Sequence, residues 1–272
     1  GGWDRDPWIH IPLGWGRILQ KRDHDWMYFA EPSENMDGRA IECARGKVIG
    51  GSSAINAMAY YHGHPSDYDR WHSNGLSGWS YAEVLPYFRR SEDWEGGANT
   101  YRGEGGPLTS RYTTFEDPLC EAFLEAGKQM GFSFTNDYNG ADPDGFARIQ
   151  ATIRKGRRWS AAAAYLHPVK NRHNLRIETN ALVEKVNFTG KRATGITYTK
   201  GGKTVTANAN IEVLLSGGSI NSPQLLMLSG IGDPVHLKGK GIDVLSPLEG
   251  VGKNLCDHTS AAFVFQRQEA LV

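Results

Sequence analysis

Residues 45–59, which we call the first glycine segment, combine residue types that suit a buried anion. The segment carries two cations, three glycines and two hydroxyl side chains, namely Arg45, Lys47, Gly46, Gly50, Gly51, Ser52 and Ser53, and it runs into an apolar, helix-compatible stretch. Glycines let the backbone turn tightly and bring its N–H groups against a phosphate, and the start of a following helix would add the positive end of its dipole. We therefore expect an anionic group at this segment.

Two common phosphate-binding motifs do not match the first glycine segment. A Walker A loop has lysine directly after its second spaced glycine, whereas Ser52 follows Gly51 and Lys47 lies near the start of the segment. The dinucleotide fingerprint G-x-G-x-x-G occurs nowhere in the chain. For this segment taken alone, a tight structural turn without a ligand is the remaining alternative.

Residues 217–232, the second glycine segment, show a different arrangement. The apolar stretch 211–216 predicts a buried strand, and a pair of glycines follows it. Ser222 then suits an N-cap with Pro223 as the first helical residue, and later glycines end the helix. Strand, glycine turn and helix start is the arrangement that binds nucleotides at the carboxyl edge of an open α/β sheet.

The remaining pattern predicts a mixed α/β chain without repeats. Ser80 and Glu83 form a capping-box pattern for a helix that runs to about Arg90, and Asp117 with Pro118 opens another helix. An antiparallel meander is expected from the strand-like stretches at 175–179, 182–188, 193–199 and 203–207.

The two glycine segments together resemble the two signature stretches of the glucose-methanol-choline (GMC) flavoenzymes. Further resemblance lies in residues 60–67, 78–88, 158–166 and 250–258. It extends along nearly the whole chain and is strongest to the choline-dehydrogenase-like and alcohol dehydrogenase branch. It implies an α/β fold with an FAD-binding doubly wound sheet, an antiparallel meander and part of an inserted substrate domain. On that basis the domains expected are 1–115 and 157–267 for FAD binding, and 116–156 and 268–272 for substrate binding.

The resemblance also implies a cofactor-binding role for particular residues. Residues 45–53 would pass along the pyrophosphate and ribityl parts of FAD, Asn56 to Ala59 would lie against the isoalloxazine ring, and Val183 and Gly218 would meet the adenosine half. A lone strand valine is otherwise usually core. Some relatives attach FAD through a histidine where this chain has Ile55, so we expect non-covalent FAD. The complete set expected to bind FAD is Arg45, Gly46, Val48, Gly50, Gly51, Ser52, Asn56, Ala57, Met58, Ala59, Val183 and Gly218.

The activity implied is oxidation of an alcohol to an aldehyde or ketone, with hydride transfer to flavin N5 and electrons passing on to oxygen or a redox carrier. The family's fingerprint turn and its C-terminal catalytic histidine find no match in this chain. We therefore expect an internal, truncated part of a longer enzyme and assign it no catalytic residue. The alternatives are an inactive fragment that at most binds nucleotide, or a GMC-fold lyase or oxidase.

Composition limits the partners that we expect. Of 272 residues, 30 are Lys or Arg and 30 are Asp or Glu, so no net charge favours nucleic acid. No apolar run approaches the length of about 20 residues that spans a membrane. Three widely spaced cysteines fit reduced thiols in a cytoplasm. We expect no metal site: His62 and His64 lack further ligands, and Asp257 with His258 suits a loop pair or a group near the active site equally well.

Overall fold

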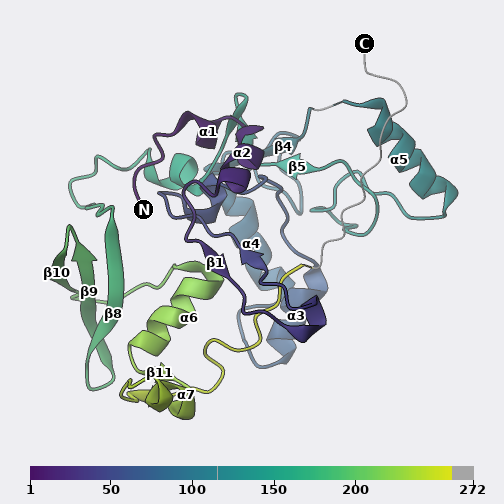
Figure 1. Ribbon diagram of the computed structural model, residues 1–272. Coiled ribbons are helices and arrows are strands. Elements are labelled where there is room, and N and C mark those ends of the chain that lie inside the picture. The colour runs from purple at the N-terminus through teal and green to yellow at the C-terminus, as the bar shows by residue number, and fades with distance from the viewer. Residues whose placement is uncertain (115, 259–272) are drawn as a thin grey trace. The chain divides into compact units, whose positions relative to one another are not determined.

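The computed structural model describes residues 1–114 and 116–258 of the chain (Figure 1). The chain divides into two compact units, Gly1–Thr179 (unit 1) and Asn180–Val272 (unit 2). Each unit combines short helices with small sheets, which confirms the predicted mixed class. The boundaries that we expect between cofactor and substrate domains stay a prediction.

Two helices of unit 1 begin at the caps that the sequence predicts. In α4 (Tyr81–Ser91), Ser80 and Glu83 form the predicted capping box, and in α5 (Pro118–Gln129) the Asp117 carboxylate accepts the backbone N–H of Leu119 at 2.8 Å. The other helical elements of the unit are α1 (Pro7–His10), α2 (Gly14–Lys21), α3 (Pro65–Ser73), the 3₁₀ turns η1 (Glu34–Met36) and η2 (Gly51–Ala54), and the π-helical turn η3 (Ala162–Leu166).

The strands of unit 1 form three small sheets. They are β1 (Tyr28–Phe29) with β2 (Glu42–Cys43), β3 (Glu92–Trp94) with β4 (Leu108–Tyr112) and β5 (Gln150–Ala151), and β6 (Ile153–Arg154) with β7 (Arg157–Arg158). Within the central sheet β3 and β4 run parallel, whereas β4 and β5 are antiparallel. This sheet places a polar cluster in the interior of the unit.

That polar cluster is centred on the fully buried side chains of Glu92 and Arg102. Arg102 donates through Nε to Glu92 Oε2 at 3.0 Å and through Nη1 to Asp137 Oδ1 at 2.6 Å, and Ser110 Oγ donates to Glu92 Oε1 at 2.7 Å. The Arg102 guanidinium also lies 3.8 Å from the centroid of the Trp94 ring. Although burial opposes the charged form, the hydrogen bonds to Glu92 and Asp137 raise the pKa of Arg102 above its ordinary value.

Unit 2 contains the predicted antiparallel meander, drawn in green in Figure 1. Its strands are β8 (Ala181–Thr189), β9 (Arg192–Lys200) and β10 (Lys203–Asn208), and two turns that contain glycine connect them. Gly195 is required in β9, since a Cβ at that position would lie 2.2 Å from the carbonyl oxygen of Ala207. The remaining elements are α6 (Gly218–Leu228), α7 (Pro234–Gly239) and the parallel pair β11 (Ile231–Gly232) and β12 (Ser246–Pro247).

Two strand predictions in this region are wrong. Residues 175–179 and 211–216 are not in strands, and the side chains of Ile211 and Leu214 are exposed. The apolar pattern at 211–216 is that of a strand buried between neighbours, but no described strand pairs with it, so its backbone has no ladder of hydrogen bonds to join. The sheets of the described residues are accordingly small, with two or three strands each.

In residues 1–114 and 116–258, no helix combines the length and the apolar character needed to cross a membrane. All three cysteines of the chain, Cys43, Cys120 and Cys256, are free thiols.

Candidate cofactor-binding site

Buried apolar side chains hold the first glycine segment in the core of unit 1, while other side chains of the segment are exposed. Val48, Ala54 and Ile55 pack with Ile9 and Ile18 in one apolar cluster. Met58 is also buried, whereas the side chains at the neighbouring positions 52, 56, 57 and 59 are exposed. The segment therefore has a buried side that holds it in the core and an outer face available to a ligand. That outer face consists of Ser52, Asn56, Ala57 and Ala59.

Glycines give the segment its tight turn. Gly50 and Gly51 have left-handed backbones with φ of 91° and 56°. The backbone N–H of Gly46 donates to Ser52 Oγ at 3.1 Å, and a Cβ at Gly46 would lie only 2.3 Å from the carbonyl oxygen of Gly51. A Cβ at Gly51 would instead meet no atom within 4 Å. The segment thus folds back on itself while the backbone at Gly51 stays open to close approach.

No α-helix follows this turn, so the expected helix start at the first glycine segment is wrong. The chain makes the short 3₁₀ turn η2 and then leaves helical geometry at Met58, whose φ is +65°. Asn56 Oδ1 accepts the backbone N–H of Met58 at 3.1 Å, a local bond that competes with helix formation. Ala59 then bridges to Ala151 in β5. A helix dipole therefore contributes nothing to anion binding at this segment.

Both cations of the segment have partners within unit 1. The Lys47 ammonium lies 4.5 Å from the ring centroid of Trp26, and Arg45 Nη1 donates to the carbonyl oxygen of Ala44 at 2.7 Å. The backbone N–H of Arg45 donates to Asp25 Oδ1 at 2.9 Å. Burial of Asp25 opposes its ionisation, yet this bond and those from Arg22 and Met27 keep the pKa of Asp25 below its ordinary value.

Arg158 is a buried residue that hydrogen-bonds the backbone of the first glycine segment, a role that no sequence pattern indicates. Its side chain is 2% exposed. Nε donates to the carbonyl oxygen of Ile9 at 2.7 Å, and Nη1 donates to the carbonyl oxygens of Ser53 at 3.2 Å and Asn56 at 2.6 Å. Burial lowers the pKa of Arg158 to about 10. No local pattern could have identified this role, because the partners lie more than a hundred residues away along the chain.

The chain that leaves the segment is fixed by side-chain amides. Asn139 accepts the backbone N–H of His62 at 2.7 Å through Oδ1, and its Nδ2 donates to the carbonyl oxygen of Tyr60 at 3.1 Å and to Gln150 Oε1 at 2.9 Å. His62 is buried, whereas His64 is exposed and its Nδ1 accepts the N–H of Ser66 at the start of α3. Within the described ranges, no three side chains with metal-binding groups cluster.

The remaining two predicted residues, Val183 and Gly218, belong to unit 2. Val183 lies in β8 opposite Tyr198, next to a bulge, and α6 packs against β8. Gly218 has φ of +85°, and a Cβ there would meet no atom within 4 Å. The ten predicted residues of the first glycine segment are thus together in unit 1, and the other two lie in unit 2.

The predicted start of α6 is wrong by five residues. The helix begins at Gly218, and Pro223 lies inside it rather than at its first position. Ser222 Oγ accepts the backbone N–H of Gly217 at 2.9 Å, so its hydroxyl still satisfies a donor at the helix start, although from within the helix. Pro223 costs the helix one N–H but does not prevent a turn from forming before it. The helix ends before Gly230, as predicted.

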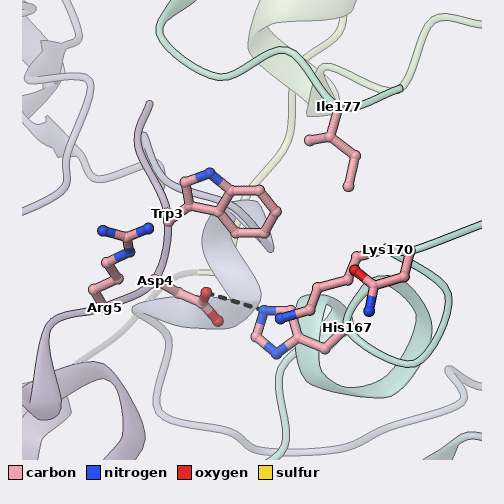
Figure 2. A pocket seen from close by; sticks show the side chains of 7 residues that line it. Trp3, Asp4, Arg5, His167, Lys170 and Ile177 are labelled. Atoms are coloured by element: carbon pink, nitrogen blue, oxygen red, sulfur yellow. Dashed lines mark hydrogen bonds and ion pairs between the residues drawn. The ribbon is translucent and has the colours of Figure 1, made fainter. Parts of the chain in front are cut away.

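A cavity of about 520 Å³ in unit 1 lies beside Asp4, and none of the predicted cofactor-binding residues lines it (Figure 2). Figure 2 shows the Asp4 carboxylate and the His167 ring facing each other, with Asp4 Oδ1 3.0 Å from His167 Nε2. The other carboxylate oxygen of Asp4 is buried and makes no hydrogen bond. At the end of the described range, Asp257 Oδ1 accepts the backbone N–H of His258 at 2.8 Å. Whether this pair also lies near the active site stays a prediction.

Comparison with known proteins identifies the family. A family model described as GMC oxidoreductase matches residues 29–260. The chain is 48% identical over 267 residues to an oxygen-dependent choline dehydrogenase of Rhizobium etli, covering 98% of this chain and 48% of the relative.

Solved structures agree with that assignment. A crystal structure of pyridoxine 4-oxidase from Mesorbium loti matches with a TM-score of 0.85 at 36% identity, over 91% of this chain and 49% of that one. An FAD-dependent oxidoreductase from Chaetomium thermophilum matches with a TM-score of 0.85 at 30% identity, over 92% of this chain and 45% of that one. The chain therefore spans about half the length of the proteins it matches. The resemblance inferred from the two glycine segments is confirmed, and the chain belongs to the GMC oxidoreductase family.

Proposed function

We propose that this chain supplies the FAD-binding part of an enzyme that oxidises an alcohol to an aldehyde or ketone. The observation that carries the proposal is the outer face of the first glycine segment, where an open glycine backbone and exposed small side chains lie side by side in a member of the GMC family. Relatives named as a choline dehydrogenase, a pyridoxine oxidase and an FAD-dependent oxidoreductase support the same chemistry.

The residues of this face fit a flavin in their chemistry. The open space at Gly51 allows a bulky group to approach the backbone closely. Asn56 offers a polar amide, and Ala57 and Ala59 present little bulk to a planar ring. We propose that residues 56–59 lie against the ring and that residues 45–53 hold the ribityl and pyrophosphate part. Val183 and Gly218 are proposed to meet the adenosine half.

Bound FAD would supply the hydride acceptor, which no amino-acid side chain provides. The part played by this chain is to orient the ring and to keep water from one of its faces. Ile55 is 2% exposed within the apolar cluster and carries no nucleophilic atom, which supports non-covalent binding. We assign no catalytic acid or base to the described residues.

The alcohol is proposed to be choline or a similar small alcohol, because the curated relative is named for choline. Oxygen is the proposed electron acceptor, since that relative is called oxygen-dependent, and a redox carrier is the alternative. Free thiols and a balanced charge support our proposal of a cytoplasmic protein that does not bind nucleic acid.

Flavin retention by the purified 272-residue chain tests the proposal. We expect FAD to stay with the chain through gel filtration and to show a visible flavin band. Anaerobic addition of choline or a primary alcohol should bleach that band only when the complete coding sequence is expressed. Failure of both proteins to retain FAD would refute the proposed function.

The inactive fragment remains the second candidate for the isolated chain. It is favoured by the exposed Ile211 and Leu214, which leave apolar surface that promotes association. A colourless 272-residue chain that aggregates, beside a yellow, alcohol-reducible complete protein, would support this candidate.

A further inference from the structure

Arg158 is a buried cation without an acidic partner among the described residues. Its side chain is 2% exposed, and its four hydrogen bonds all go to uncharged oxygen atoms. Its remaining nitrogen, Nη2, is buried and makes no hydrogen bond. An unpaired buried guanidinium is costly, so this arrangement is poorly explained by stability alone. Its position suggests what it does, because three of the four hydrogen bonds converge on residues 53–56.

The decisive contact is with the side chain of Asn56. Asn56 Oδ1 accepts from Arg158 Nη1 at 2.8 Å and from the backbone N–H of Met58 at 3.1 Å. Both groups can only donate, so the acceptor atom of the amide must face them. The two bonds therefore fix the amide orientation chemically, with oxygen directed inward.

The other end of the amide is consequently available. Asn56 is exposed, and its Nδ2 donates to no described residue. It lies on the outer face of the first glycine segment, between the buried Ile55 and the exposed Ala57. The face therefore presents an N–H donor at a fixed position rather than an amide that can turn either way.

We propose that Arg158 is a positioning residue that holds the Asn56 amide so that its Nδ2 donates a hydrogen bond to an acceptor atom of the flavin ring. This inference rests on the proposed function. A donor at the ring stabilises the additional negative charge of the reduced cofactor relative to the oxidised one, so it raises the reduction potential of bound flavin. Arg158 acts through Asn56 and does not itself need to touch the ring.

The substitution Asn56→Asp separates this role from a structural one. The carboxylate would still accept from Arg158 and Met58, and it would give Arg158 the anionic partner it lacks, so the melting temperature of the FAD-free chain should stay equal or rise. The outward donor is lost, and a negative charge lies near the ring. We expect FAD affinity to fall by about tenfold and the reduction potential of the bound flavin to fall.

Substitutions at Arg158 test the same link from the other end. Arg158→Met releases the amide and should weaken FAD binding, whereas Arg158→Lys keeps one donor and should restore part of the affinity. Arg157→Met changes the exposed neighbour in β7 and serves as a control. Asn99→Asp is matched to Asn56→Asp, because Asn99 is exposed and its Oδ1 also accepts two backbone N–H groups, from Tyr101 and Arg102. Both controls should leave affinity and potential unchanged.

The measurements are FAD dissociation constants by fluorescence titration, the flavin potential by dye equilibration, and thermal unfolding of the FAD-free chain. If neither the wild-type 272-residue chain nor the complete protein binds FAD, the proposed function fails and this inference with it. If only the complete protein binds FAD, the same variants are compared in that protein. A wild-type chain that binds FAD, with Asn56→Asp unchanged in affinity and potential, would overturn the inference while leaving the function intact. Should Arg158→Met fail to fold, Asn56→Asp and Arg158→Lys decide the question.

Discussion

Replacement of His62 by phenylalanine tests whether a buried imidazole makes unit 1 sensitive to acid. His62 is 3% exposed, stacks on Phe88 with ring centroids 4.8 Å apart and meets the edge of Tyr60 at 5.4 Å. Neither ring nitrogen makes a hydrogen bond, although Nε2 lies 3.7 Å from Glu92 Oε2. His62→Phe should therefore keep the ring contacts and sacrifice no hydrogen bond.

The expected size of the effect follows from the pKa of His62. Burial lowers this pKa from 6.5 to about 4, helped by Arg102 and opposed by Glu92 and Asp137. The unfolded chain thus binds a proton at this site at a higher pH than the folded chain, so stability falls as the pH drops below 6.5. The proton linkage amounts to a loss of about 2 kcal/mol between about pH 7 and pH 5, and about 3 kcal/mol by about pH 4.

Urea unfolding of the wild type and of His62→Phe, at neutral pH and at about pH 5, measures the effect. We expect the free energy of unfolding of the wild type to fall by about 2 kcal/mol more than that of the variant over this interval. His173→Phe makes the same substitution at an exposed histidine of unit 1 and should leave the pH dependence unchanged. Equal losses for the wild type and His62→Phe would refute the reasoning, because the imidazole would then have no depressed pKa.

Three further substitutions probe unit 1 by urea or thermal unfolding. Arg102→Met should lower the free energy of unfolding by about 3–5 kcal/mol, because it leaves the buried Glu92 carboxylate without its partner. The double variant with Glu92→Leu should lower it by less than Arg102→Met alone. A larger loss in the double variant would contradict this. Gly46→Ala should lower the free energy of unfolding by about 1–3 kcal/mol and abolish FAD retention, since its Cβ would lie 2.3 Å from the carbonyl oxygen of Gly51. Unchanged stability and unchanged FAD retention would contradict this prediction, because the turn would then accommodate the added methyl group. Ser80→Ala should cost about 1 kcal/mol through loss of the capping box of α4, and an unchanged melting temperature would exclude that role.

Features set by neighbouring residues could be predicted from the sequence. The capping box at Ser80, the helix opened by Asp117 and the meander of β8 to β10 all form as expected, because each depends on contacts within a few residues or on a short hairpin turn. The first glycine segment could also be predicted as a ligand-binding turn that is not a Walker A loop, since the spacing of its glycines and the position of its lysine are read directly from the sequence.

Features that depend on distant partners could not be predicted. Arg158 reads as one of two adjacent arginines, and only the fold shows that it is buried while Arg157 is exposed. The stretch 211–216 has the composition of a buried strand but lacks a neighbour to pair with among the described residues. In the first glycine segment, apolar composition favoured a helix, whereas the chain makes one 3₁₀ turn and the backbone N–H of Met58 then donates to Asn56 Oδ1 instead of joining a helix.

This early end of the helix has a consequence for how the site is built. A helix at residues 54–59 would have hydrogen-bonded its own backbone, but the observed turn leaves the carbonyl oxygens of Ser53 and Asn56 for Arg158. Those oxygen atoms are among the groups that make burial of the arginine tolerable, and the arginine in turn fixes the amide of Asn56. Three features therefore depend on one another: the early end of the turn, the hydrogen bonds of Arg158 and the outward-facing Nδ2 of Asn56. A substitution that alters any one of them should alter the other two.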